Sequence, residues 1–140
     1  TVMQILPAIR RMDLRVVTTA VNVALELRDA RDVTVTLTGG TLRRRTAEMV
    51  GHIAERTLRD INIDVVVIGT DGLSGAAGLT TYDASEAYVN RVMIEQAREV
   101  WIVADHSKFG QVFPAVICPL ARVRRIITDT GATAAMIADA

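Results

Sequence analysis

Two patterns of apolar residues alternate along the chain. Short runs of β-branched and aliphatic residues predict strands, whereas stretches in which apolar residues recur every three or four positions predict amphipathic helices. Strands are expected over residues 14–18, 33–38, 64–69, 100–104, 115–118 and 125–128. Helices are expected over residues 20–29, 46–61, 84–99 and 132–140, with Asp83 or Ser85 as N-cap of the third.

The alternation of strands and helices predicts an α/β fold. Residues 64–69 are almost continuously apolar, as a strand covered on both faces of a parallel sheet should be. The expected architecture is a mostly parallel, Rossmann-like three-layer sheet with helices on both faces and right-handed connections. No linker, internal repeat or low-complexity segment divides the chain, so residues 1–140 are expected to form a single domain.

The chain starts with a helical pattern, interrupted by Pro7, that leads directly into a strand. A fold of this kind is expected to begin with a strand. We therefore expect the first strand to precede Thr1 and the chain to be a fragment of a longer protein.

Composition narrows the function classes. Sixteen basic and sixteen acidic residues give a formal net charge of zero, and no basic stripe is present. This balance argues against a nucleic-acid-binding surface on the chain itself. The single cysteine, Cys118, excludes an internal disulfide and fits a reducing cytoplasm. No apolar run approaches the roughly 20 residues of a membrane span, so a soluble cytoplasmic protein is expected.

Polar residues gather after four of the expected strands. Ligands of parallel sheets bind beyond the carboxyl ends of the strands, which makes these residues candidates for a binding site. Glycines, hydroxyls, carboxylates and cations together suit a small polyhydroxylated anion such as a sugar phosphate. The candidates are Thr18, Thr19, Gly39, Gly40, Arg43, Asp71, Gly72, Asp105, Ser107 and Lys108, together with Glu86 at the start of a helix.

Several candidates have a plainer interpretation. Gly39 and Gly40 are equally consistent with a tight turn, and the arginines at 43–45 with a solvated loop. Glu86 either interacts with the helix dipole or points into the same cleft. His52 is expected to be exposed, and His106 to be a loop residue more often outside than inside a site.

The histidines and the cysteine give no sign of a metal site. Two scattered histidines and a lone Cys118, expected in the core, do not have the spacing of a metal centre. We therefore expect no metal and no cofactor.

Lys108 is the only lysine among the sixteen basic residues, the other fifteen being arginine. In a chain whose composition suggests a codon bias toward arginine, a retained lysine suggests a use for its compact ammonium charge. It lies in "IVADHSKFGQ", where an apolar strand ends abruptly in four polar residues. The alternative is a leftover lysine on a solvated loop.

The strand-end motifs resemble, in order, the C-terminal effector-sensing domain of DeoR-type bacterial repressors. The motifs are "RVVTTAVNVALEL", "LTGGTLR", "VVVIGTDGLSGAAGLTT", "EAYVNRVMIEQA" and "IVADHSKFGQ…RIITD". The resemblance implies the fold of ribose-phosphate isomerase and glucosamine-phosphate deaminase. It also implies a phosphorylated sugar or sugar-derived effector that controls DNA binding by a separate N-terminal helix-turn-helix domain.

The related isomerases carry an Ala-Asp-x-Ser-Lys segment whose lysine lies near the substrate phosphate, and "ADHSK" matches it. The resemblance thus implies that Lys108 contacts phosphate, with Asp105 and Ser107 shaping the loop. Two departures are visible. The family's Asp-x-Gly-x-Thr loop is not in the sequence, which starts at or just after its place, and Thr18-Thr19 stands where Thr-Asn is usual.

A phosphosugar isomerase or deaminase on the same fold is the alternative. Asp71 matches one isomerase acid, but Ile68 takes the place of the other. No lysine replaces the catalytic one, because residues 72–81 are uncharged, and Glu86 lies about one helical turn from the isomerase glutamate. A sensor rather than an enzyme is therefore expected. Assembly is also expected: operator-binding repressors commonly match two-fold DNA symmetry, and exposed apolar residues such as Met49 and Ile53 could pair subunits.

Overall fold

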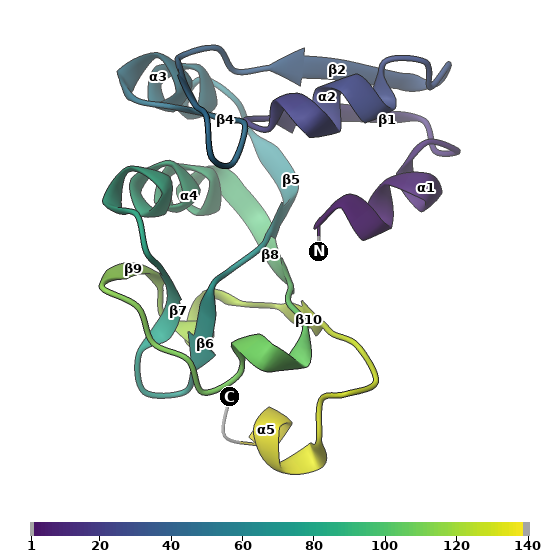
Figure 1. Ribbon diagram of the computed structural model, residues 1–140. Coiled ribbons are helices and arrows are strands. Elements are labelled where there is room, and N and C mark those ends of the chain that lie inside the picture. The colour runs from purple at the N-terminus through teal and green to yellow at the C-terminus, as the bar shows by residue number, and fades with distance from the viewer. Residues whose placement is uncertain (1, 139–140) are drawn as a thin grey trace. The chain divides into compact units, whose positions relative to one another are not determined.

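The computed structural model describes residues 2–138 (Figure 1). Contacts divide these residues into two compact units: Met3–Asp60, and Val2 together with the residues from Ile61 onward. Each unit has its own parallel strands and its own apolar core. None of the helices formed by residues 2–138 is long and apolar enough to cross a membrane.

The unit of residues 3–60 is built on two parallel strands, β1 (Leu14–Thr18) and β2 (Val33–Leu37). The helix α2 (Val21–Leu27) connects them, and the turn η1 (Val2–Ile5) and the short helix α1 (Leu6–Ile9) precede them. Apolar residues on one stripe of α2 face the sheet because helical positions three or four apart share a face. The buried core of this unit is Leu6, Val23, Leu27 and Val33.

The predicted helix over residues 46–61 is wrong in its first turn. Residues 41–50 form an antiparallel hairpin of β3 (Thr41–Arg43) and β4 (Glu48–Val50), and α3 (His52–Arg59) begins only after Gly51. Ala47, with φ 55°, and Gly51, with φ 90°, both have left-handed backbone that a continuous right-handed helix excludes. The apolar spacing of residues 46–50 therefore reflects a strand rather than a helix.

The unit from residue 61 onward contains three parallel strands in the order β10-β8-β5. They are β5 (Ile63–Ile68), β8 (Ala97–Val103) and β10 (Arg125–Ile127). The helix α4 (Ala84–Gln96) precedes β8 and contributes Ala87 and Ile94 to the apolar core. Residues 97–99, predicted as the end of that helix, instead begin β8, because the chain becomes extended at Ala97.

A second sheet in this unit is antiparallel, with strand order β6-β7-β9. Its strands are β6 (Gly72–Ser74), β7 (Gly78–Thr81) and β9 (Ala115–Cys118). The glycines allow close packing: a Cβ on Gly72 would collide with the carbonyl of Gln111, and one on Gly78 with the carbonyl of Cys118. The sequence predicted β9 but not its antiparallel partners.

Residues 2–138 also contain two further turns and a short helix: η2 (His106–Lys108), η3 (Leu120–Arg122) and α5 (Ala134–Ala138). The α/β class is confirmed. Among the described residues β1 pairs only with β2, and β5 only with β8. The absent first strand and the single domain stay predictions.

Candidate functional site

The carboxyl ends of β5, β8 and β10 lie at one edge of their sheet, because the three strands are parallel and adjacent. They lead into the loops at residues 69–71, 104–108 and 128–131. All three loops carry polar or charged side chains. This edge is where parallel sheets bind ligands.

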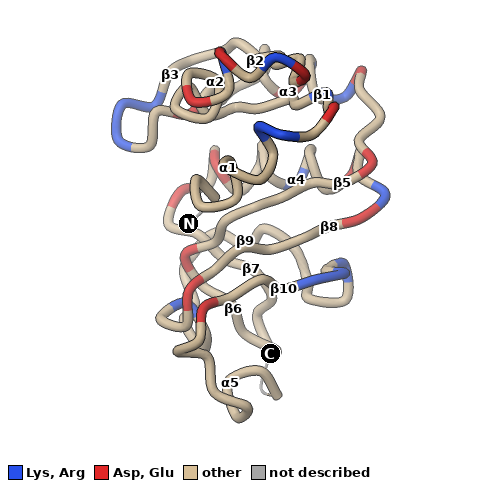
Figure 2. Tube along the Cα trace, turned by 90° about the vertical axis from the view of Figure 1, so that its right-hand side faces the viewer, with Lys and Arg blue, Asp and Glu red and all other residues tan. Residues whose placement is uncertain are grey.

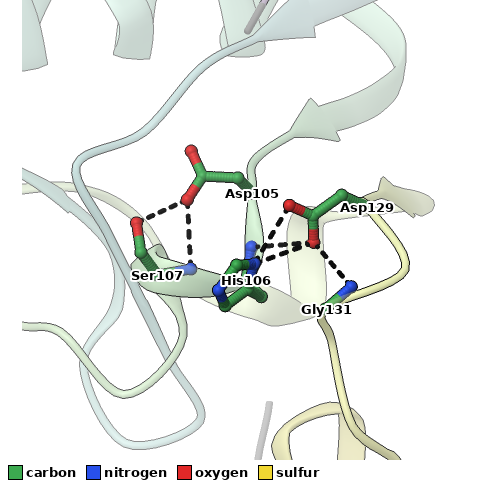
Figure 3. Close-up of polar contacts among 5 residues, drawn as sticks. All are labelled: Asp105, His106, Ser107, Asp129 and Gly131. Carbon is green, nitrogen blue, oxygen red and sulfur yellow. Dashed lines mark hydrogen bonds and ion pairs between the residues drawn. The ribbon is translucent and has the colours of Figure 1, made fainter.

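Asp105 holds the turn η2 in place after β8. Its carboxylate accepts hydrogen bonds from the backbone N–H of Ser107, at 3.0 Å, and from the Ser107 hydroxyl (Figure 3). The bonds from Ser107 and the charge of Lys108 hold the pKa of Asp105 below its usual value. The structure thus places Asp105, Ser107 and the half-buried Lys108 in one ordered turn at the sheet edge.

His106 and Asp129 form a second polar cluster that connects the ends of β8 and β10 (Figure 3). The imidazole Nδ1 lies 3.0 and 3.1 Å from the two carboxylate oxygens of Asp129. One of these oxygens also accepts bonds from the backbone N–H groups of His106, at 3.3 Å, and Gly131, at 3.1 Å. This pairing raises the pKa of His106 and lowers that of Asp129.

Asp129 was not among the sequence candidates. The signal for it is present in "RIITD", where the carboxylate comes immediately after the predicted strand at residues 125–128. Residues beyond the carboxyl end of a parallel strand are candidates for ligand binding.

Asp71 connects the loop after β5 to the segment that leads into α4. One of its carboxylate oxygens accepts a bond from the Thr81 hydroxyl at 2.8 Å and from the Tyr82 N–H at 3.4 Å. Asp83 then caps α4 by accepting bonds from the backbone N–H groups of Ser85 and Glu86, at 2.9 and 3.0 Å. Glu86 is half-buried in the first turn that this cap begins.

Backbone contacts bring the loop after η2 beside β6. Gly110 donates to the carbonyl of Leu73 at 2.8 Å, and Leu73 and Phe109 form an isolated parallel bridge. Gly72 packs directly against the carbonyl of Gln111. The predicted residues Asp71 and Gly72 therefore lie on a segment adjoining the one that carries Lys108.

The remaining candidates belong to the unit of residues 3–60. Thr18 and Thr19, at the end of β1, are each 9% exposed. The Thr18 hydroxyl accepts from the Ala20 N–H at 3.1 Å, and the Thr18 carbonyl accepts from the Thr38 N–H at 3.1 Å. The Thr38 N–H bond joins the carboxyl ends of the neighbouring parallel strands β1 and β2. Gly39 directly follows Thr38, so it lies beside Thr18 and Thr19.

Gly39 and Gly40 have φ angles of 74° and 117°, so a turn by itself accounts for both glycines. The arginine run lies in the β3–β4 hairpin. Arg43 is half-buried at the end of β3, and its two neighbours are exposed in the turn. The hairpin placement agrees with a solvated loop for the exposed pair. A ligand contact by Arg43 stays a prediction.

No group of three or more metal-ligating side chains occurs within residues 2–138. Burial raises the pKa of the Cys118 thiol, which keeps it protonated and unsuited to nucleophilic attack. His52 is exposed at the start of α3. Polar and charged side chains lie at the sheet edge, and their contact with a ligand stays a prediction.

Comparisons with known proteins agree with one another. Residues 1–130 match the family model described as the DeoR C-terminal sensor domain. The chain is 41% identical over 113 residues to the HTH-type transcriptional regulator GlpR of Haloferax volcanii, covering 81% of this chain and 44% of that protein. It is 34% identical over 122 residues to a putative aga operon transcriptional repressor of Escherichia coli O157:H7, with coverages of 87% and 45%.

A third relative is the glycerol-3-phosphate regulon repressor of Escherichia coli K12, 32% identical over 117 residues. That match covers 84% of this chain and 46% of the repressor. The chain therefore spans somewhat less than half the length of the curated relatives it matches. All three relatives are named as transcriptional regulators.

Proposed function

Because this chain belongs to the family of DeoR C-terminal sensor domains, we propose that it binds a phosphorylated sugar or sugar-derived metabolite. Binding would control DNA recognition by an N-terminal domain of the full-length cytoplasmic protein. The family membership supports the sensing role. The chemistry of the strand ends supports the class of ligand.

The observation that carries the ligand class is the turn at residues 105–108. Lys108, the only lysine of the chain, lies in a turn held by Asp105 and Ser107 at the carboxyl end of β8. A compact ammonium group at a half-buried strand end suits a phosphate. One charge-assisted contact of this kind is worth about 1.5–3 kcal/mol.

The carboxylates nearby suit the hydroxyl groups of a sugar. Asp71 accepts two hydrogen bonds from its own chain through one oxygen, so its second oxygen is the one suited to a ligand hydroxyl. One relative is named for a glycerol-3-phosphate regulon, which places small polyol phosphates beside sugar phosphates among the ligands to test.

The chain's relatives are regulators, which supports a regulatory rather than an enzymatic role. The side chains at the positions of the isomerases' catalytic groups also favour a regulatory role. Ile68, where the isomerases have an acid, is buried in the apolar core of its unit. Residues 72–81 supply no charged group for proton transfer between sugar carbons.

The test is a thermal-shift screen of sugar and polyol phosphates on the full-length protein, followed by operator-binding measurements with each hit. We expect at least one phosphate to raise the melting temperature and to change operator affinity, because a ligand that binds the folded state stabilises it. A panel without hits would contradict the ligand class. Turnover of a sugar phosphate by the purified protein would favour the isomerase alternative.

A further inference from the structure

His106 has an unusually constrained side chain for a turn residue. Its side chain is 49% exposed, yet its Nδ1 is held by both carboxylate oxygens of Asp129. The same carboxylate accepts from the backbone N–H of His106 at 3.3 Å. Backbone and ring are thus fixed by one acid (Figure 3).

Gly131 fixes the ring from a second direction. A Cβ built on Gly131 would meet three atoms of the imidazole, Nδ1, Cε1 and Cγ, the latter two at 2.8 Å. The ring therefore lies directly against the backbone of Gly131. Gly131 also donates its N–H to Asp129, so residues 129–131 contact the imidazole both through the Asp129 carboxylate and through the Gly131 backbone.

The constraint determines what the other ring nitrogen offers. With Nδ1 directed at a carboxylate, Nδ1 is the protonated nitrogen, and Nε2 on the opposite side of the ring points away from Asp129. When the imidazole is cationic, Nε2 is an N–H donor that makes no hydrogen bond to any of the described residues. A fixed donor on a half-exposed ring is accessible to a bound anion.

We propose that His106 is a second anion-binding side chain of this sheet edge, oriented by Asp129, and that its Nε2–H contacts the phosphate of the effector alongside Lys108. The inference rests on the proposed function, because the ligand is the same phosphorylated metabolite. It adds a binding residue and a positioning residue that the sequence candidates did not contain.

The charges around His106 favour the cationic form. Asp129 accepts from its ring, and Asp105 adds a smaller attraction; both raise the pKa of His106. Lys108 in turn lowers the pKa of Asp105, so the charged groups of the turn act on one another at short range. The turn thus carries two basic side chains, His106 and Lys108, that can each donate a charge-assisted hydrogen bond to a phosphate.

The experiment compares phosphate binding by full-length wild type and four variants, using the hit of the thermal-shift screen and calorimetry at several pH values. His106→Ala removes the donor. Asp129→Asn keeps an oxygen that can accept from the N–H groups of His106 and Gly131 but no longer favours the imidazolium. His52→Ala is the matched control, because His52 is exposed on α3. Lys108→Ala tests the proposed function itself.

We expect His106→Ala to weaken phosphate binding about 5- to 20-fold at pH 6. Asp129→Asn should weaken it less, and His52→Ala not at all. The ratio of wild-type to His106→Ala affinity should shrink as the pH rises through the raised pKa of His106, since the cation is lost there.

Failure of this inference and failure of the proposed function give different results. If Lys108→Ala loses binding while His106→Ala binds as wild type at every pH, His106 and Asp129 are a structural clamp only, and the inference is overturned. A constant loss that does not change with pH would also overturn it, because a structural defect has no reason to follow imidazole ionisation. Absence of binding by wild type would overturn both proposals.

Discussion

Lys108 is positioned by the turn η2, which its neighbours Asp105 and Ser107 hold in place. Asp105 caps η2, and Ser107 supplies both a backbone and a hydroxyl donor to that carboxylate. Because these hydrogen bonds order the turn before a ligand binds, binding loses less conformational entropy. An ordered cation at a strand end is what a phosphate site requires.

The pKa of the Asp105 carboxyl group tests whether Ser107 holds the turn. Because hydrogen bonds from Ser107 stabilise the ionised carboxylate, its pKa is depressed in the folded protein. This stabilisation is present above the unfolded pKa and is lost as the pH falls through the folded pKa. We predict that Ser107→Ala moves the pKa of Asp105 back toward its ordinary value, measured by NMR titration of the carboxyl carbon.

Ser85→Ala is the control for this titration, since Ser85 lies in α4 and not in the turn that Asp105 caps. An unchanged Asp105 pKa in Ser107→Ala would show that Ser107 does not hold the turn. The role assigned to Asp105 in shaping the Lys108 loop would then fail.

At the scale of elements, residues with strong local signals were predicted well. The β-branched runs became β1, β2, β5, β9 and β10, and the helix over residues 84–96 has Asp83, one of two predicted candidates, as its N-cap. The β6–β7 hairpin was missed because its glycines carry no strand signal. They are there for close backbone contacts, which appear only after folding.

The N-cap of α4 gives a prediction at the same scale. Asp83→Ala removes the acceptor for the N–H groups of Ser85 and Glu86, so the free energy of unfolding should fall by about 1 kcal/mol. Ser85→Ala is the matched neighbour: its side chain is exposed and the Asp83 acceptor stays in place, so stability should change by less than about 0.5 kcal/mol. Urea denaturation of both variants measures the difference. Equal stabilities would refute the assignment of Asp83 as the cap.

For the candidate site, the sequence predicted which strand ends carry polar residues but not the hydrogen-bond partners that fix those residues in position. The predicted residues fall into one group in each unit. In each group a predicted side chain accepts a hydrogen bond from a nearby backbone N–H: Thr18 from Ala20, and Asp105 from Ser107. His106 and Asp129 lie 23 positions apart, so their pairing is not visible from spacing along the chain. Contacts between distant segments depend on strand order, which a single sequence does not specify.

At the scale of the whole molecule, the balance of basic and acidic residues argues against DNA binding by this chain itself. Basic and acidic residues are equal in number and interspersed along the trace (Figure 2). Nucleic-acid-binding surfaces need a continuous basic patch to neutralise phosphates. We predict that residues 1–140 alone show no sequence-selective DNA binding in gel shifts. Tight, selective binding by this chain would place the DNA-reading surface here instead. Homo-oligomerisation of the full-length protein stays a prediction.

The central claim is that the chain senses a phosphorylated small molecule through Lys108. The most direct measurement is calorimetry of full-length wild type and Lys108→Ala with the phosphate found by screening and with its unphosphorylated parent. We expect wild type to bind the phosphate far more tightly than the parent, and Lys108→Ala to lose about 10- to 150-fold in phosphate affinity with little change in folding. Equal phosphate affinities of the two proteins, or equal binding of phosphate and parent by wild type, would contradict the account.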